Sequence, residues 1–197
     1  MNIKENDSDQ AVYTNDVQDV IVHCEYVSNM AYLLGKKLNL DEQTVKELAI
    51  AGYLHDVGKL RLLGYIYGNE SKSVLDQMAR VRTHPKYSYD IIKGKGYSKF
   101  IEDAVYHHHE NYDGTGYPDN LRGEDIPLGA RVLRICDVFI ALTSDRPYRM
   151  AFDKEAALAL MIEEVKNFDM KIFLVFQTLI HEIDIDKDVR RKMYVSV

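Results

Sequence analysis

The sequence predicts an all-α protein. Several stretches carry apolar residues at the i, i+3, i+4 and i+7 spacing of helices that bury one face, and no stretch of useful length alternates as a half-buried strand does. With 197 residues, 46% of them hydrophobic and 28% charged, the chain suits a single domain with one core. We therefore predict one helical domain over residues 17–197, built from about six to eight helices of ordinary length. Residues 1–16 are polar and aperiodic, which is typical of a tail or the remnant of a linker.

The first predicted helix covers residues 17–37. Its apolar stripe includes Val20 and Val27, and His23 falls on the same stripe. Asp19 precedes His23 by about one helical turn, so that the two side chains can share a face. A single histidine on an apolar face is usually a packed core residue. His23 therefore becomes a candidate ligand only in combination with the histidines that follow.

The second predicted helix covers residues 42–56. Val45 and Gly52 belong to its inward-facing series, and the same series continues onto His55 and Asp56. The buried face of this helix is thus expected to end in an imidazole beside a carboxylate. Because burying an unpaired carboxylate costs free energy, a cation or a strong hydrogen-bond donor should lie beside Asp56.

Gly58 is expected to end this second helix. Residues 61–72 contain glycines and an asparagine and are predicted to form a connecting loop, which is followed by a helix over residues 73–83. His84 comes one turn after the last apolar residue of that helix, and Pro85 is predicted to open the next short helix.

The most unusual stretch is Tyr106–Pro118, in which three consecutive histidines and an acid are followed by a glycine-rich turn. Three adjacent side chains cannot all face one core. In a helix predicted over residues 98–110, His108 continues the apolar face and His109 lies at its edge, whereas His107 points largely the other way. We therefore expect His108 and His109 to point inward.

A long helix is predicted from Pro127, and Asp137 lies on its apolar face. The polar segment after it contains two arginines, Arg146 and Arg149, and Asp153 is predicted to cap the next helix. One or two further helices without a chemical signal complete the predicted domain.

The charge balance and the cysteines restrict the class of protein. There are 25 Lys and Arg against 31 Asp and Glu, a net charge of −6, which argues against binding to duplex nucleic acid or to an anionic membrane surface. No run approaches the roughly 18 apolar residues of a membrane span, and the N-terminus lacks a signal peptide. Cys24 and Cys136 form no CxxC pair and are expected to be buried, reduced thiols. We predict a soluble cytoplasmic protein.

Histidines and carboxylates from the inward faces of several predicted helices point to a buried metal centre. The candidate ligands are His23, His55, Asp56, His84, His108, His109 and Asp137. Imidazole and carboxylate ligands without thiolates suit Fe, Mn or Zn. Seven ligands are too many for one tetrahedral zinc ion, so we predict two metals, with Asp56 as the bridging carboxylate. Two ions about 3.5–4 Å apart suit the hydrolysis of a phosphoester by an activated hydroxide.

Two motifs resemble those of the HD-GYP family, a branch of the HD metal-dependent phosphohydrolases. The first is His55-Asp56-Val57-Gly58-Lys59, and the second is His108-His109-Glu110…Asp113-Gly114-Thr115-Gly116-Tyr117-Pro118. The resemblance covers roughly residues 17–170. It implies a single helical HD-type domain and a phosphodiesterase that hydrolyses cyclic di-GMP, a bacterial signalling molecule, to pGpG and often on to GMP. It also implies a binuclear centre at the seven candidate ligands, commonly of iron or manganese rather than zinc, nickel or cobalt.

The resemblance also suggests roles for residues outside the ligand set. Lys59 matches a lysine that contacts the scissile phosphate, which makes it catalytic together with Asp56. Tyr117, Arg146 and Arg149 match positions that grip the nucleotide or its second phosphate. Some members hold a third metal through a glutamate at the position of Asp19, and the shorter side chain here favours two metals and leaves a third open.

Two other functions remain open at this point. One is hydrolysis of another cyclic dinucleotide, such as cyclic GMP-AMP, because no residue certifies guanine recognition. The other is a signalling module that binds nucleotide without turning it over. Because the sequence shows no sensor domain, regulation would come through a protein partner, a homo-oligomer or a longer chain.

Overall fold

The computed structural model describes residues 7–66, 81–145 and 149–190, and the side chains of residues 17–62 within the first range. Helices and no strands are found in these ranges, which confirms the predicted all-α class. The α-helices are α1 (Asp7–Lys37), α2 (Glu42–Leu54), α3 (Val57–Ile66), α5 (His84–Ile92), α6 (Lys99–His107), α7 (Leu128–Thr143), α8 (Lys154–Glu163), α9 (Met170–Glu182) and α10 (Ile185–Asp188). Short 3-10 turns cover Gly123–Asp125 and Val165–Asn167.

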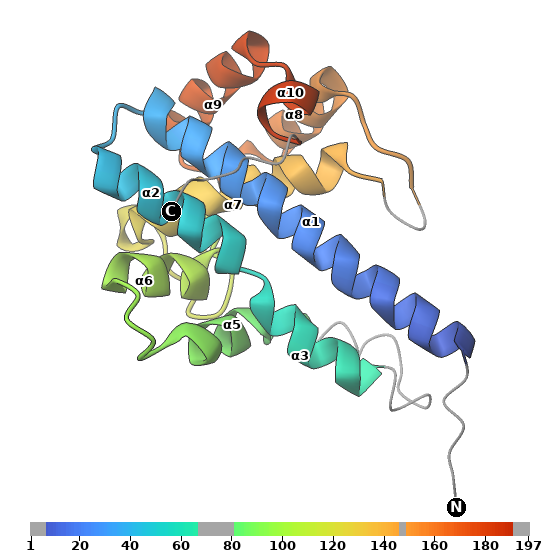
Figure 1. The fold of residues 1–197 in the computed structure, drawn as a ribbon. Helices are drawn as coiled ribbons and strands as arrows, with labels where there is room; N and C mark the ends of the chain where they lie inside the picture. The colour runs from blue at the N-terminus through green and yellow to red at the C-terminus, as the bar shows by residue number, and fades with distance from the viewer. Residues whose placement is uncertain (1–6, 67–80, 146–148, 191–197) are drawn as a thin grey trace, which may run out of the picture.

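Helices α1 and α7 organise the fold. The long α1 crosses the molecule with α2 beside it, the C-terminal helices α8 to α10 gather at one end, and α3 and α5 lie toward the other (Figure 1). Helix α7 packs against α1, α2, α6, α8 and α9. As a result, even the consecutive residues Ile135, Cys136 and Asp137 are buried on it. A buried helix of this kind can present a carboxylate to the interior, as predicted for Asp137.

Aromatic and aliphatic side chains fill the core between α1, α7 and α9. Phe139 of α7 and Phe176 of α9 meet edge to face with ring centroids 5.2 Å apart. Met30 and Leu34 of α1 are fully buried in the same cluster. Both cysteines are buried free thiols, as predicted. Within the described residues, no helix is both long and apolar enough to span a membrane.

The segment after His55 differs from the prediction. Helix α2 ends at Leu54, and α3 then covers residues 57–66, so the loop predicted from residue 61 is wrong over residues 61–66. An isolated glycine inside a helix costs only about 1 kcal/mol, and the glycine in this stretch was therefore a weak loop signal. The predicted helix over residues 73–83 lies largely outside the described residues. Helix α1 begins at Asp7 rather than near residue 17.

Gly58 serves close packing rather than ending a helix. It lies in the first turn of α3, and its backbone N–H donates to Ser88 Oγ on α5 at 2.9 Å. A Cβ atom at this position would lie 2.6 Å from the backbone nitrogen of Ser88 and closer still to the carbonyl oxygen of His84. Glycine thus lets α3 approach α5, which brings the His55–Asp56 turn next to His84.

The predicted helix starts near the site are confirmed. Pro85 lies in the first turn of α5, and Pro127 is the N-cap residue of α7. Asp153 caps α8 by accepting a hydrogen bond from the backbone N–H of Ala156. In α8 the core-facing residues include Leu158, whereas Leu160 is only partly buried.

Candidate metal centre

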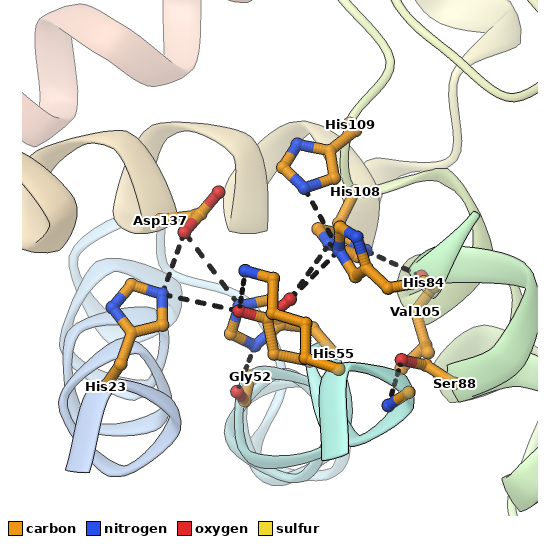
Figure 2. A network of polar contacts seen from close by, with 12 residues as sticks. His23, Gly52, His55, His84, Ser88, Val105, His108, His109 and Asp137 are labelled. Carbon is orange, nitrogen blue, oxygen red and sulfur yellow. Dashed lines mark hydrogen bonds and ion pairs between the residues drawn. The ribbon is translucent and has the colours of Figure 1, made fainter. Parts of the chain in front are cut away.

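The seven predicted ligands come together in the interior from five parts of the fold. His23 lies on α1, Asp137 on α7, and His84 is the first residue of α5. The other four follow helix ends: His55 and Asp56 come directly after α2, and His108 and His109 directly after α6. Figure 2 shows the side chains directed toward a common centre, with His23 and Asp137 on one side and His109 on the other.

Three of the histidines have the same backbone contact. The Nδ1 atoms of His55, His84 and His108 lie 2.7, 2.6 and 2.7 Å from the carbonyl oxygens of the residues three positions earlier. A carbonyl oxygen only accepts hydrogen bonds, so each Nδ1 must carry the proton. In the neutral imidazole, the form that binds a metal, each Nε2 is then an unprotonated lone pair. Hydrogen bonds from Nδ1 to a backbone carbonyl fix the tautomer of metal-binding histidines.

These lone pairs point at one another. Nε2 of His84 lies 3.1 Å from Nε2 of His108 and 3.2 Å from Nε2 of His109. Because His84 and His108 hold their protons on Nδ1, no N–H donor joins this pair. The Nε2 of His84 also lies 2.9 Å from Oδ1 of Asp56, and this oxygen has no hydrogen-bond partner. Such a cluster is compatible with a bound cation, and its imidazole and carboxylate donors suit a divalent transition metal.

A second group lies on the other side of Asp56. Its Oδ2 is 3.3 Å from Nε2 of His55, a buried atom without a hydrogen-bond partner, and 3.8 Å from Nε2 of His23. His23 also contacts Oδ1 of Asp137 at 2.9 Å. Donor atoms of Asp56, His84, His108 and His109 lie within 4.8 Å of one another, and so do those of His23, His55 and Asp56. Asp56 belongs to both groups, which is the place expected of a bridging carboxylate.

The pKa values of the two buried carboxylates and of His55 depend on one another's charge. Burial would raise the pKa of Asp56, but His55 and Lys59 outweigh it and hold the pKa well below its usual value. Burial would also raise the pKa of Asp137, but the hydrogen bond from His23 and the neighbouring histidines together outweigh it and hold the pKa well below its usual value. For His55, burial is outweighed by Asp56, so its pKa is raised well above the usual value. Both carboxylates are therefore ionised and attract positive charge.

The residues predicted to act on the substrate border this centre on one side. Nζ of Lys59, in the first turn of α3, lies 2.5 Å from Oδ2 of Asp56. Burial lowers the pKa of Lys59, but Asp56 and Asp137 outweigh it and raise the pKa, so the side chain is a cation. The ring of Tyr117 stacks on that of His109, with centroids 4.8 Å apart and planes 25° apart. Burial raises the pKa of Tyr117 to about 12, which keeps the phenol neutral.

The three remaining predicted residues, Arg149, Arg146 and Asp19, have different outcomes. The guanidinium of Arg149 donates to the carbonyl oxygens of Ala141 and Leu142 at the end of α7, so in this structure it serves as a helix cap. Arg146 lies outside the described residues. Asp19 lines, together with His23, a cleft of about 310 Å³ beside the metal centre.

Glu110 is a buried residue whose role was missed in the sequence. Its two carboxylate oxygens accept hydrogen bonds from the backbone N–H groups of Asp119 at 2.7 Å and Leu121 at 3.1 Å. These bonds hold the loop that carries Tyr117 against the end of α6. The signal was present, because an acid directly after two inward-facing histidines has to find donors once it is buried.

The pKa of His109 leads to a testable prediction. Burial lowers it from its usual value to about 3, so the folded protein keeps this side chain neutral, whereas the unfolded chain binds a proton below about pH 6.5. The wild type without metal should therefore lose stability relative to His109→Gln as the pH falls, by about 2 kcal/mol between pH 7.5 and 5. Urea unfolding in EDTA at both pH values measures this difference, and the same substitution at the exposed His181 is the control. A difference that does not change with pH would show that folding leaves the pKa of His109 unaltered.

The family follows from comparison with known proteins. The family model described as "HD domain" matches residues 6–172. The chain belongs to the HD domain family. This confirms the family that the two motifs predict, and the match spans all seven clustered side chains.

Curated relatives agree with this assignment. The cyclic di-GMP phosphodiesterase response regulator RpfG of Xanthomonas campestris is 40% identical over 68% of this chain and 36% of its own length. The 3'3'-cGAMP-specific phosphodiesterase 3 of Vibrio cholerae is 33% identical over 73% of this chain and 31% of its own. The chain thus spans about a third of the length of these relatives.

Solved structures show the same fold. A cyclic GMP-AMP-specific phosphodiesterase of Vibrio cholerae matches 86% of this chain and 46% of its own, with a TM-score of 0.66 at 17% identity. An HDG"Y"P protein of Bdellovibrio bacteriovorus matches 82% of this chain and 52% of its own, also with a TM-score of 0.66, at 20% identity.

Proposed function

We propose that this domain is a phosphodiesterase that hydrolyses cyclic di-GMP to pGpG, and pGpG further to GMP, with two divalent metal ions. The observation that carries the proposal is the cluster of unprotonated Nε2 atoms around Asp56, which an ordinary hydrogen-bonded core does not explain. The sequence similarity to RpfG, itself a cyclic di-GMP phosphodiesterase, supports this choice of substrate.

The two ligand groups suggest how the metals are held. His84, His108 and His109 would hold one ion, and His23, His55 and Asp137 the other, with Asp56 shared between them. Two ions bound in this way would supply an activated water as nucleophile and neutralise the charge of the phosphate. Iron and manganese fit the imidazole and carboxylate donors and remain our choice of metal, ahead of zinc, nickel and cobalt.

The protein's own groups would then act on the phosphate. The oxygen of the attacking water would form a bond to phosphorus while the bond to the 3′ oxygen breaks, and the proton that the water loses would pass to the 3′ oxygen. Lys59 remains a cation next to Asp56 and would stabilise the negative charge that builds up on the phosphate oxygens. Tyr117 stays a neutral hydrogen-bond donor at the edge of the site.

A second substrate has specific support. Three relatives from Vibrio cholerae are 3'3'-cGAMP-specific phosphodiesterases, at 31–33% identity. No residue predicted from the sequence certifies recognition of guanine. Cyclic GMP-AMP is therefore the alternative substrate. A cytoplasmic location and regulation through a partner protein or a homo-oligomer stay predictions.

Product analysis tests the proposal. The protein, loaded with Fe²⁺ or Mn²⁺ without air, is incubated with cyclic di-GMP or cyclic GMP-AMP, and the products are separated by chromatography. We expect pGpG from cyclic di-GMP, and no product after treatment with EDTA. Faster cleavage of cyclic GMP-AMP would favour the alternative substrate. If both substrates bind and stay intact in a metal-loaded sample, the domain is a binding module.

A further inference from the structure

Arg134 is a cation at the metal centre to which the proposed mechanism gives no role. It lies on α7, three residues before Asp137, so the two side chains share a face of that helix. Its Nε donates to Oδ1 of Asn111, two residues after His109, at 3.0 Å. This bond fixes the plane of the guanidinium at the point where α7 contacts the residues that follow His109.

The terminal nitrogens of Arg134 remain available for a ligand. Among the described residues, no carboxylate lies within 4.0 Å of its guanidinium, and the side chain is only partly exposed. Neither terminal nitrogen has a hydrogen-bond partner among the described residues, and neither is one of the fully buried unpaired polar atoms. By contrast, Arg131 on the same helix pairs with Asp169 at 2.6 Å, and Arg149 caps α7.

The helix position and the hydrogen bond of Arg134 place it beside the centre, because it precedes Asp137 by about one turn of α7 and its partner Asn111 follows His109 by two residues. Burial lowers the pKa of Arg134, and Asp137 and Tyr117 are the groups that oppose this most strongly. Arg134 in turn is one of the cations that lower the pKa of His109. It therefore lies on the side of the centre bordered by Asp137, His109 and Tyr117. A guanidinium with a fixed plane and free terminal nitrogens is suited to a bidentate contact with a phosphate.

We infer that Arg134 binds the phosphodiester of the cyclic dinucleotide that is not being cleaved. The inference rests on the proposed function. A cyclic dinucleotide carries two phosphodiesters, and the one being cleaved takes the metals and Lys59. The other needs a cation of its own. Of the two arginines predicted for this role, Arg149 is occupied by carbonyl oxygens and Arg146 lies outside the described residues, whereas Arg134 is already positioned.

The test compares a substrate with two phosphodiesters to one with a single phosphodiester. Cyclic di-GMP and bis(p-nitrophenyl) phosphate are hydrolysed by the metal-loaded wild type and by Arg134→Gln. We expect the KM for cyclic di-GMP to rise about tenfold or more, with little change in kcat, because a charge-assisted bidentate contact is lost. Hydrolysis of bis(p-nitrophenyl) phosphate should be unchanged. Arg122→Gln removes an exposed arginine and controls for the change in net charge. It should change the hydrolysis of neither substrate.

A second variant separates binding from a tethering role. Asn111→Ala removes the partner of Nε but keeps the cation, so it should raise the KM less than Arg134→Gln does. Equal effects of the two variants on both substrates and on Tm would overturn the inference, because Arg134 would then only hold the loop. An unchanged KM for cyclic di-GMP in Arg134→Gln would also overturn it.

Failure of the proposed function can be told apart from failure of this inference. If the wild type cleaves neither cyclic dinucleotide, the inference is tested by measuring the equilibrium binding of cyclic di-GMP to the metal-loaded protein. Binding that is at least about tenfold weaker in Arg134→Gln supports the phosphate contact even without turnover. Equal binding by the two proteins, or no binding by the wild type, overturns it.

Discussion

Replacing Asp56 with Asn should remove both metal ions and reduce hydrolysis of cyclic di-GMP by at least about a thousandfold. The reason is that Asp56 belongs to both ligand groups, with one oxygen 2.9 Å from His84 and the other 3.3 Å from His55. Asparagine has nearly the same shape but lacks the negative charge. The measurements are the metal content per chain by mass spectrometry and the rate of pGpG formation.

The control is Asp103→Asn on α6, which removes a carboxylate that pairs with Lys99 far from the interior histidines. This variant should keep its metals and its activity. Circular dichroism of both variants shows whether the helices are retained, because Asp56→Asn also leaves Lys59 without its carboxylate. If a folded Asp56→Asn protein still binds two ions per chain, Asp56 is not the bridging ligand.

Helical periodicity was sufficient to predict which histidines and carboxylates come together in the interior. His23 and Asp137 lie within regular helices, where spacing determines direction, and both are buried. His55 and His108 were predicted from the same periodicity, although each lies just beyond its helix. Both side chains still point inward, because the first residue after a helix continues nearly the direction that its side chain would have within the helix. Its Nδ1–H can also donate to a carbonyl oxygen of the last turn.

Features that depend on contacts between distant segments could not be predicted in the same way. Gly58 resembled a helix stop, yet it is required by the backbone of His84 and Ser88, nearly thirty residues further along the chain. Arg149 was predicted to bind phosphate, but its guanidinium donates to the backbone carbonyl oxygen of Leu142. Whether that oxygen lies within reach depends on the path of the backbone. For Arg134 the spacing to Asp137 was visible in the sequence, but its lack of an acidic partner among the described residues was not.

Gly116 should be the most sensitive position of the loop that carries Tyr117. A Cβ atom there would lie 2.5 Å from Cα of Glu110 and 2.5 Å from the carbonyl oxygen of His109, and closer still to the backbone nitrogen of Asn111. Because these are backbone atoms, the loop has to move. We expect Gly116→Ala to lower the free energy of unfolding by about 3 kcal/mol, as for severe overpacking. Urea unfolding of the metal-loaded protein measures this loss.

The same displacement should impair the metal centre. The N–H of Tyr117 donates to the carbonyl oxygen of His109 at 3.1 Å, and its ring stacks on the His109 ring, so moving the loop releases this ligand. Misplacing a group of the site by about 1 Å can cost about a hundredfold in rate, and we expect a loss of that size.

The control is Gly94→Ala, where φ is +72° and no atom lies within 4 Å of the added Cβ. That variant should lose only about 1 kcal/mol from its left-handed backbone and keep its activity. If both variants lose the same stability and retain full activity, the loop does not depend on its approach to residues 109–111, and the stacking of Tyr117 does not position His109.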